Sequence, residues 1–102
     1  MKDSDPSWFG FLLTCREKTD RERVVNFIEN KNIQTRMLFA GNLIKHPCFD
    51  DMRSNGTGYR IVGQLDNTDT VMNKTFWVGV YPGMTEEMIR YMSDAIHDSV
   101  KQ

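Results

Sequence analysis

The chain has 102 residues, 39% of them hydrophobic, which suffices for one domain with a modest core. Its 13 basic and 14 acidic residues leave a formal net charge of −1 with no block of one sign, which argues against nucleic acid as the main partner, since phosphate binding needs a concentrated basic face. No apolar run approaches the roughly 20 residues that cross a bilayer, and the polar opening lacks a signal peptide's apolar core.

These features predict a cytoplasmic protein that binds neither nucleic acid nor membrane. Its two cysteines, Cys15 and Cys48, lie far apart and form no CxxC pair, so we expect free thiols instead of a disulfide scaffold. Residues 1–7 are polar and include a proline, and we predict a disordered lead-in or the stub of a linker there. Residues 8–102 contain no internal repeat and are predicted to form a single α+β domain.

The first two elements are a strand and a helix. Residues 8–15 are aromatic and aliphatic over a strand's length. Residues 19–22 then read T-D-R-E, the pattern of a capping box with Thr19 as the N-cap, and apolar residues follow at helical spacing. We predict a helix over residues 20–31 that ends near Asn32, because asparagine tolerates the left-handed conformation of a helix end.

Residues 33–40 form the predicted central strand. Successive side chains of a strand point to opposite faces, so Thr35 and Met37 share the candidate core face while Arg36 projects from the other. A guanidinium there can grip a carboxylate or phosphate through two parallel hydrogen bonds. The alternative is a surface arginine paired with a neighbouring acid.

The middle of the chain is less regular. Residues 41–57 show weak periodicity, and residues 54–58 are a cluster of turn formers. Residues 59–65 are either a strand or an extended arm with no partner. Asn67 or Thr68 can cap a short helix that runs to about Asn73.

A strand and a long helix close the chain. Residues 76–81 are rich in aromatic and β-branched side chains and end at Pro82. Thr85 is a good N-cap, and two glutamates follow at the positive end of the helix dipole. The stripe predicted to be buried consists of Met88, Ile89, Met92, Ala95, Ile96 and Val100.

This order of elements predicts an α+β fold with a small antiparallel or mixed sheet and helices on one face. The other face then also carries apolar side chains, namely Trp8, Leu12, Leu38, Trp77 and Tyr81. A sheet that is apolar on both faces needs a second layer. Either a partner outside this chain supplies that layer, or residues 41–58 fold over it.

Several motifs resemble those of one known family. They are TRMLFAGN at residues 35–42, His46-Pro47, NTD at residues 67–69 and TFWVGVYPGMT at residues 75–85. Together they resemble the C-terminal small domain of the DegT/DnrJ/EryC1/StrS family of pyridoxal-phosphate-dependent sugar enzymes. The likeness is greatest to the RfbH-like branch, the nucleotide-hexulose 3-dehydratases of lipopolysaccharide and dideoxysugar biosynthesis.

The resemblance implies the fold of aspartate aminotransferase and a homodimeric parent enzyme. An N-terminal domain of the parent would bind pyridoxal or pyridoxamine phosphate, and the parent would remove the 3-hydroxyl of a nucleotide-linked 4-keto-6-deoxyhexose. The family places its cofactor-binding histidine or lysine in that larger domain. For residues 1–102 alone we therefore expect no catalytic residue, no bound cofactor or metal, and no activity.

The resemblance also suggests substrate-binding residues. Arg36 matches the arginine of the TRxLFAGN motif and would face the cofactor cleft, where it would grip an anionic group. Phe39, Asn42 and His46 follow in the same segment and could line the cleft. The alternatives are a structural asparagine turn at Asn42 and a capping or surface role for His46.

Other functions stay open from the sequence. The same small domain occurs in sugar aminotransferases; the histidine or lysine that separates them from dehydratases is not in this chain, and only the TRxLFAGN segment favours the dehydratase. A stand-alone ligand-binding module of ferredoxin-like topology is a different class of protein that the element order also allows. Metal binding by His46 and Cys48 is weaker, because two ligands fall short of the four that a structural zinc needs.

Overall fold

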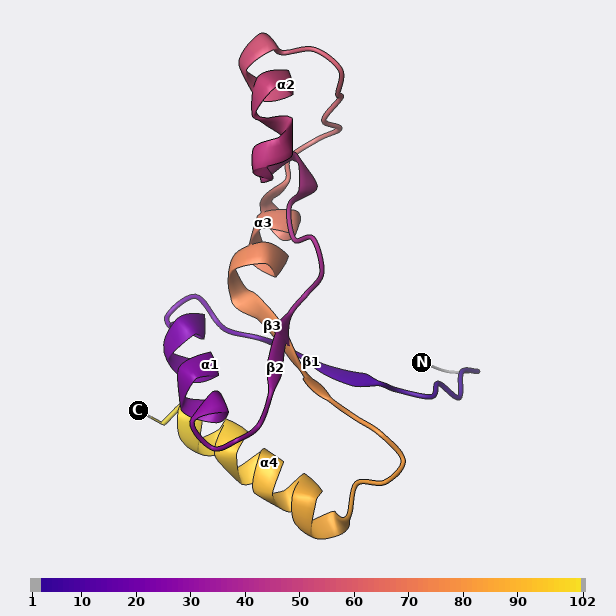
Figure 1. The fold of residues 1–102 in the computed structure, drawn as a ribbon, viewed down its shortest axis with the longest axis vertical. Helices are drawn as coiled ribbons and strands as arrows, with labels where there is room; N and C mark the ends of the chain where they lie inside the picture. The colour runs from indigo at the N-terminus through magenta and orange to yellow at the C-terminus, as the bar shows by residue number, and fades with distance from the viewer. Residues whose placement is uncertain (1–2, 102) are drawn as a thin grey trace.

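The computed structural model describes residues 3–101 and has the predicted α+β architecture (Figure 1). In chain order the elements are β1 (Gly10–Thr14), α1 (Arg21–Glu29), β2 (Thr35–Met37), the 3-10 helices η1 (Leu43–Lys45) and η2 (Pro47–Phe49), α2 (Asp50–Asn55), α3 (Asp66–Lys74), β3 (Thr75–Gly79) and α4 (Glu86–Ser99).

The three strands form an antiparallel sheet in the order β1-β3-β2. The pairing register puts Val78 of β3 between Phe11 and Thr35, and the next row puts Trp77 between Leu12 and Arg36. Neighbouring rows face opposite sides of a sheet. Thr35 therefore points into the core and Arg36 away from it, as predicted. Met37, which was predicted to share the core face with Thr35, is 42% exposed, because β2 ends there at the edge of the core.

The core lies on one face of the sheet, under α1 and α4. Its buried apolar side chains are Val24, Val25, Ile28, Ile33, Phe76, Val78 and Ala95. The Tyr91 hydroxyl of α4 also donates a hydrogen bond of 3.1 Å to the Lys31 carbonyl just after α1. The predicted arrangement of helices on one face is confirmed.

The helix caps correct the sequence prediction in two places. Asp20, and not Thr19, is the N-cap of α1, and its carboxylate accepts the Glu22 N–H at 3.0 Å. Helix α3 begins one residue before Asn67, and its N-cap residue makes no side-chain hydrogen bond. At α1 two cap-forming residues stand side by side and the backbone path into the helix selects the second, whereas at α3 the N-cap is Leu65, ahead of both predicted candidates.

The other predicted ends are partly confirmed. The Thr85 hydroxyl accepts the Met88 N–H at 3.2 Å at the start of α4, as predicted. Asn32 takes the expected left-handed φ of +59, but α1 itself ends earlier, at Glu29, with Asn30 as its C-cap. The strand predicted over residues 33–40 is shorter, because β2 stops at Met37 and the backbone of Phe39 turns to φ +39. Residues 59–65 form no strand.

The buried stripe predicted for α4 is only partly right. Ala95 is buried and Met92 and Ile96 pack against the core, but Met88 and Ile89 are exposed, and so is Val100 beyond the helix. Figure 1 shows why, since the first turns of α4 run out past the sheet. Tyr81, predicted on the helix-free face, turns toward this helix instead, where its hydroxyl lies 3.9 Å from the Met88 sulfur.

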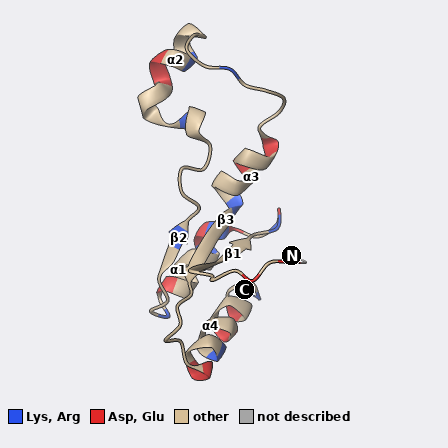
Figure 2. Cartoon of the chain, turned by 90° about the vertical axis from the view of Figure 1, so that its right-hand side faces the viewer, with Lys and Arg blue, Asp and Glu red and all other residues tan. Residues whose placement is uncertain are grey.

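Residues 42–74 leave the sheet as an arm, which contains η1, η2, α2 and α3 (Figures 1 and 2). The radius of gyration is 17.0 Å, whereas a compact domain of this length has about 13 Å. Because the arm points away from the sheet, residues 41–58 do not fold over the helix-free face, and that alternative is wrong. Within the described residues, no helix has the length and apolarity to cross a membrane.

Candidate functional site at the end of β2

Arg36 is the exposed centre of β2 and has no ionic partner. Its guanidinium forms no side-chain hydrogen bond or ion pair with any residue in 3–101. Glu29 lies nearby and lines the same shallow hollow, but its carboxylate accepts a hydrogen bond of 2.6 Å from the buried Thr35 hydroxyl. The ordinary surface ion pair considered from the sequence is therefore not formed here.

The face around Arg36 is apolar. Leu12 and Trp77 share its row, and the Phe9 ring packs edge-on against the Trp77 indole, with centroids 5.4 Å apart at 78°. A Cβ on Gly10 would lie 2.6 Å from Trp77 Cε3, so the indole occupies the space that only glycine leaves free. The site thus combines a guanidinium with a floor of aromatic and aliphatic carbon.

Phe39 is the most unusual residue of the segment. Its side chain is 77% exposed, and its φ of +39 lies in a region that bulky side chains avoid. An exposed aromatic ring on a strained backbone points to a site where function maintains the conformation. Of the predicted site residues, Arg36 and Phe39 are thus the two that the structure presents to solvent.

Asn42 is buried, with 2% of its surface exposed. Its Nδ2 donates a hydrogen bond of 2.7 Å to Asp69 Oδ1 of α3, so the side chain links the two halves of the arm. This environment matches the structural alternative for Asn42, because no face of the amide is open to a ligand. The residue positions the segment that follows Phe39.

Asp69 is the residue that sequence reasoning missed. Its carboxylate accepts Asn42 on one side and the Lys45 ammonium, at 2.9 Å, on the other. These hydrogen bonds, led by the one from Lys45, hold the pKa of the Asp69 carboxyl below its usual range. The only signal in the sequence was the NTD motif at residues 67–69, which names no partner 27 residues away.

His46 also braces the arm. Its Nε2 donates to the Ala40 carbonyl at 2.5 Å, which places the ring proton on that nitrogen. Arg53 of α2 donates to the His46 and Ile44 carbonyls and pairs with Asp50, so η1 and α2 form one unit. His46 is half-buried, and its Nε2 is not free for a ligand or metal.

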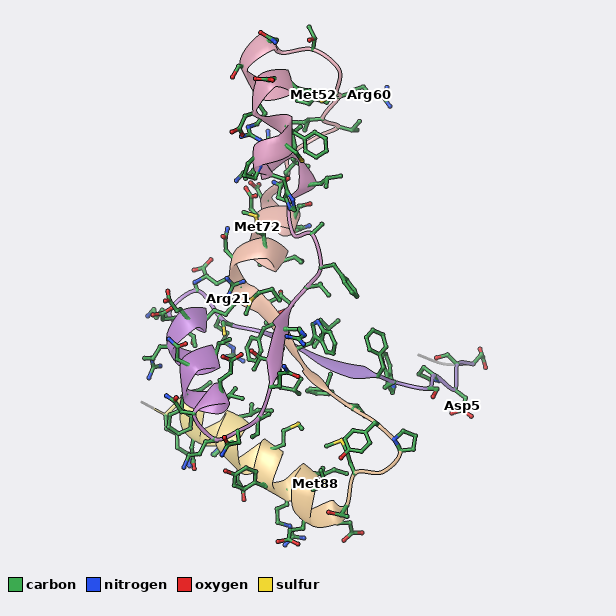
Figure 3. The ribbon with its side chains drawn as sticks, in the orientation of Figure 1. Asp5, Arg21, Met52, Arg60, Met72 and Met88 are labelled. Carbon is green, nitrogen blue, oxygen red and sulfur yellow. The ribbon has the colours of Figure 1, made fainter. Side chains whose placement is uncertain are left out.

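The base of the arm is held by Arg21 of α1. Its guanidinium donates to the carbonyls of Met72 and Thr75 at 2.5 and 3.3 Å, at the C-terminal end of α3. A positive charge there satisfies carbonyls that a helix end leaves unpaired and complements the helix dipole. Figure 3 shows Arg21 and Met72 close together where the arm meets the core.

The site can bind an anion, but the described residues offer no metal centre. No group of three or more histidine, cysteine or acidic side chains is arranged to hold a metal within residues 3–101. Both cysteines are free thiols, and burial raises the pKa of the Cys15 thiol, which makes it a poor nucleophile. The chemistry on offer is recognition of a charged ligand with an apolar or aromatic portion.

Comparison with known proteins agrees with the motifs. The model of the DegT/DnrJ/EryC1/StrS aminotransferase family matches residues 1–97. A protein of Saccharopolyspora spinosa, described as dTDP-4-dehydro-2,6-dideoxy-D-glucose 3-dehydratase, is 48% identical over 99 residues, 95% of this chain. The lipopolysaccharide biosynthesis protein RfbH of Salmonella typhimurium (strain LT2) is 50% identical over 91 residues, 87% of this chain. The chain spans 20% of the length of each relative.

Proposed function

We propose, from the premise that this chain belongs to the DegT/DnrJ/EryC1/StrS aminotransferase family, that it is the substrate-facing small domain of a nucleotide-sugar 3-dehydratase. Two relatives near 50% identity support this function, one described as a sugar 3-dehydratase and one as a lipopolysaccharide biosynthesis protein. Since the chain spans a fifth of their length, the activity is that of a longer polypeptide.

The proposal assigns the ligand contacts to Arg36 and Phe39. The single observation that carries it is the exposed, unpaired guanidinium of Arg36 beside an apolar floor. An unpaired guanidinium is suited to a carboxylate or phosphate, and nucleotide sugars carry a diphosphate. Phe39 would line the cleft with its exposed ring. Asn42 and His46 would hold the loop that presents both residues.

The proposal places the cofactor outside the described residues. Lysines in the described part of the chain include Lys45, which is paired with Asp69, Lys74, which reaches the Thr19 carbonyl, and Lys31, which lies over the Phe27 ring. Each of these three ammonium groups thus has a partner of its own within the chain. Pyridoxal or pyridoxamine phosphate, which the family resemblance implies, would be held by the N-terminal domain of the parent.

The remaining features of the parent belong to the same proposal. Residues 8–102 would act as one domain that closes over the cofactor cleft, and the parent would be a cytoplasmic homodimer that acts as a lyase. The free cysteines are compatible with a reducing compartment. In this arrangement the small domain orients the substrate and excludes water, while the cofactor supplies the electron sink for loss of the hydroxyl group.

Replacing Arg36 in the full-length parent tests the assignment. We expect Arg36→Ala to lower kcat/KM by about 10–100-fold, the loss of one charge-assisted contact, and Arg36→Lys to recover part of it. Gln34→Ala is the matched control, because Gln34 is an exposed neighbour two residues earlier. Unchanged kinetics in Arg36→Ala would reduce this residue to a surface charge.

A sugar aminotransferase is the second candidate, because the matching family is described as one. Mass spectrometry of the product separates the two reactions. A dehydratase yields the substrate minus water, whereas an aminotransferase exchanges the keto oxygen for an amine supplied by an amino acid. Amine transfer without dehydration would replace the first proposal by the second.

A further inference from the structure

Residues 58–64 lie between α2 and α3 and belong to no helix or strand. They run back from the end of α2 to α3 as an open trace (Figure 1), and none of them makes a hydrogen bond to any residue in 3–101. Its backbone N–H and C=O groups are therefore available to an added strand, as those of a strand edge are. We call residues 58–64 the strap.

The composition of the strap is that of a strand. Tyr59, Ile61 and Val62 are aromatic or β-branched, and all three are exposed, Val62 to 74%. Gly58 and Gly63 have φ of +82 and +71, a region that side chains with a Cβ avoid. The two glycines therefore delimit a four-residue segment with strand propensity, from Tyr59 to Val62.

The elements on either side of the strap, α2 and α3, are each held by polar contacts. Asp69 ties α3 to Asn42 and Lys45, Arg21 ties α3 to the core, and Arg53 ties α2 to η1. Figure 3 shows Arg60, from the strap, beside Met52 of α2 near the end of the arm. A segment fixed before it meets its partner loses less conformational entropy on binding.

We propose that the strap pairs, as an added β-strand, with the part of the family-length polypeptide that lies outside residues 1–102. The proposal rests on family membership and on the fivefold greater length of the relatives, and not on the dehydratase activity. The main-chain groups of Tyr59–Val62 would give the binding energy, and the exposed side chains would select the register.

The size of the strap favours a partner in the same polypeptide over a second copy. Four residues of strand are about 13 Å long, so their contact falls far below the roughly 800 Å² per partner of a stable complex. Within one polypeptide the covalent link supplies a high effective concentration, and a small contact then suffices.

Amide hydrogen exchange tests the proposal in both forms of the protein. In the 102-residue chain we expect residues 60–62 to exchange at the rate of unstructured peptide at every protein concentration. In the full-length parent we expect exchange to slow on the order of 100-fold. Equal rates in the two forms would overturn the proposal. Protection of the short chain that grows with its concentration would assign the strap to a second copy instead.

Two adjacent proline variants test whether strand pairing causes the protection. The N–H groups of neighbouring strand residues point to opposite edges, so only one of Ile61 and Val62 donates to the partner. In the parent, one of the two variants Ile61→Pro and Val62→Pro should therefore abolish the amide protection of the neighbouring residues. The other variant should leave that protection intact. Protection retained in both variants would show that side-chain packing, and not strand pairing, covers the strap. The readout is independent of turnover, so its failure and the failure of the dehydratase assignment are distinguishable.

Discussion

The core and the arm are stabilised by different forces. The core buries apolar side chains from α1, β3 and α4, and Ile28 is 0% exposed at its centre. The arm, residues 42–74, has almost no buried apolar side chain and is held by polar contacts at Asp69, Arg53 and Arg21, while Leu43 and Val62 face solvent. A region that is held together by hydrogen bonds and leaves apolar side chains exposed has the properties of a docking surface.

The largest effect should come from the core. Ile28→Ala removes methyl and methylene groups from the best-packed position and should lower the free energy of unfolding by about 2–5 kcal/mol. The matched substitution on the arm, Ile61→Ala, should change it by less than about 0.5 kcal/mol, because the side chain is already exposed. Urea titration of both variants measures the difference. Equal losses would mean that the arm belongs to the cooperative core.

The next effect concerns the floor of the candidate site. Gly10→Ala would place a methyl group 2.6 Å from the Trp77 ring, and we expect the overpacking to cost about 1–3 kcal/mol and to shift the tryptophan fluorescence. Gly79 faces Gly10 across the two strands, and a Cβ on Gly79 would meet no side chain or distant backbone atom within 4 Å, so Gly79→Ala is the matched control. If both variants behaved alike, the indole would not lie against Gly10.

The smallest effect should come from the arm's own anchor. Asp69→Asn removes the charge that binds Lys45, and we expect faster amide exchange in α3 with little change in core stability. Asp51→Asn is the control, because Asp51 is exposed and makes no ion pair with a described residue. Loss of core stability in Asp69→Asn would contradict the independence of the two regions.

The same contact predicts a pH dependence for the arm. The folded-state pKa of Asp69 is depressed, so its ionised carboxylate stabilises the arm fully above the ordinary carboxyl pKa near 3.8. This stabilisation is lost as the pH falls through the lower folded-state pKa. The protection factors in α3, which compare each exchange rate with the intrinsic rate at the same pH, should therefore fall in acid in the wild type. In Asp69→Asn the same acid step should be absent, and a persistent step would assign the titration to another group.

Local patterns in the sequence predicted much of the core. The Thr85 cap, the left-handed Asn32 and the alternation that turns Arg36 away from Thr35 all depend on neighbours within a few residues, and all are confirmed. The family motifs were also readable directly, since they are strings of adjacent residues. These features could be predicted from the sequence because helix caps, helix ends and strand parity follow from short-range backbone geometry.

The tertiary structure alone decided what surrounds each side chain. Asn42 was predicted to line a cleft, but its amide is buried against Asp69, a contact across 27 residues that no local pattern encodes. The exposure of Met88 and the outward course of the arm also could not be predicted locally, because they depend on which elements pack together in the tertiary structure. Periodicity identifies an apolar face but cannot say whether another element covers it.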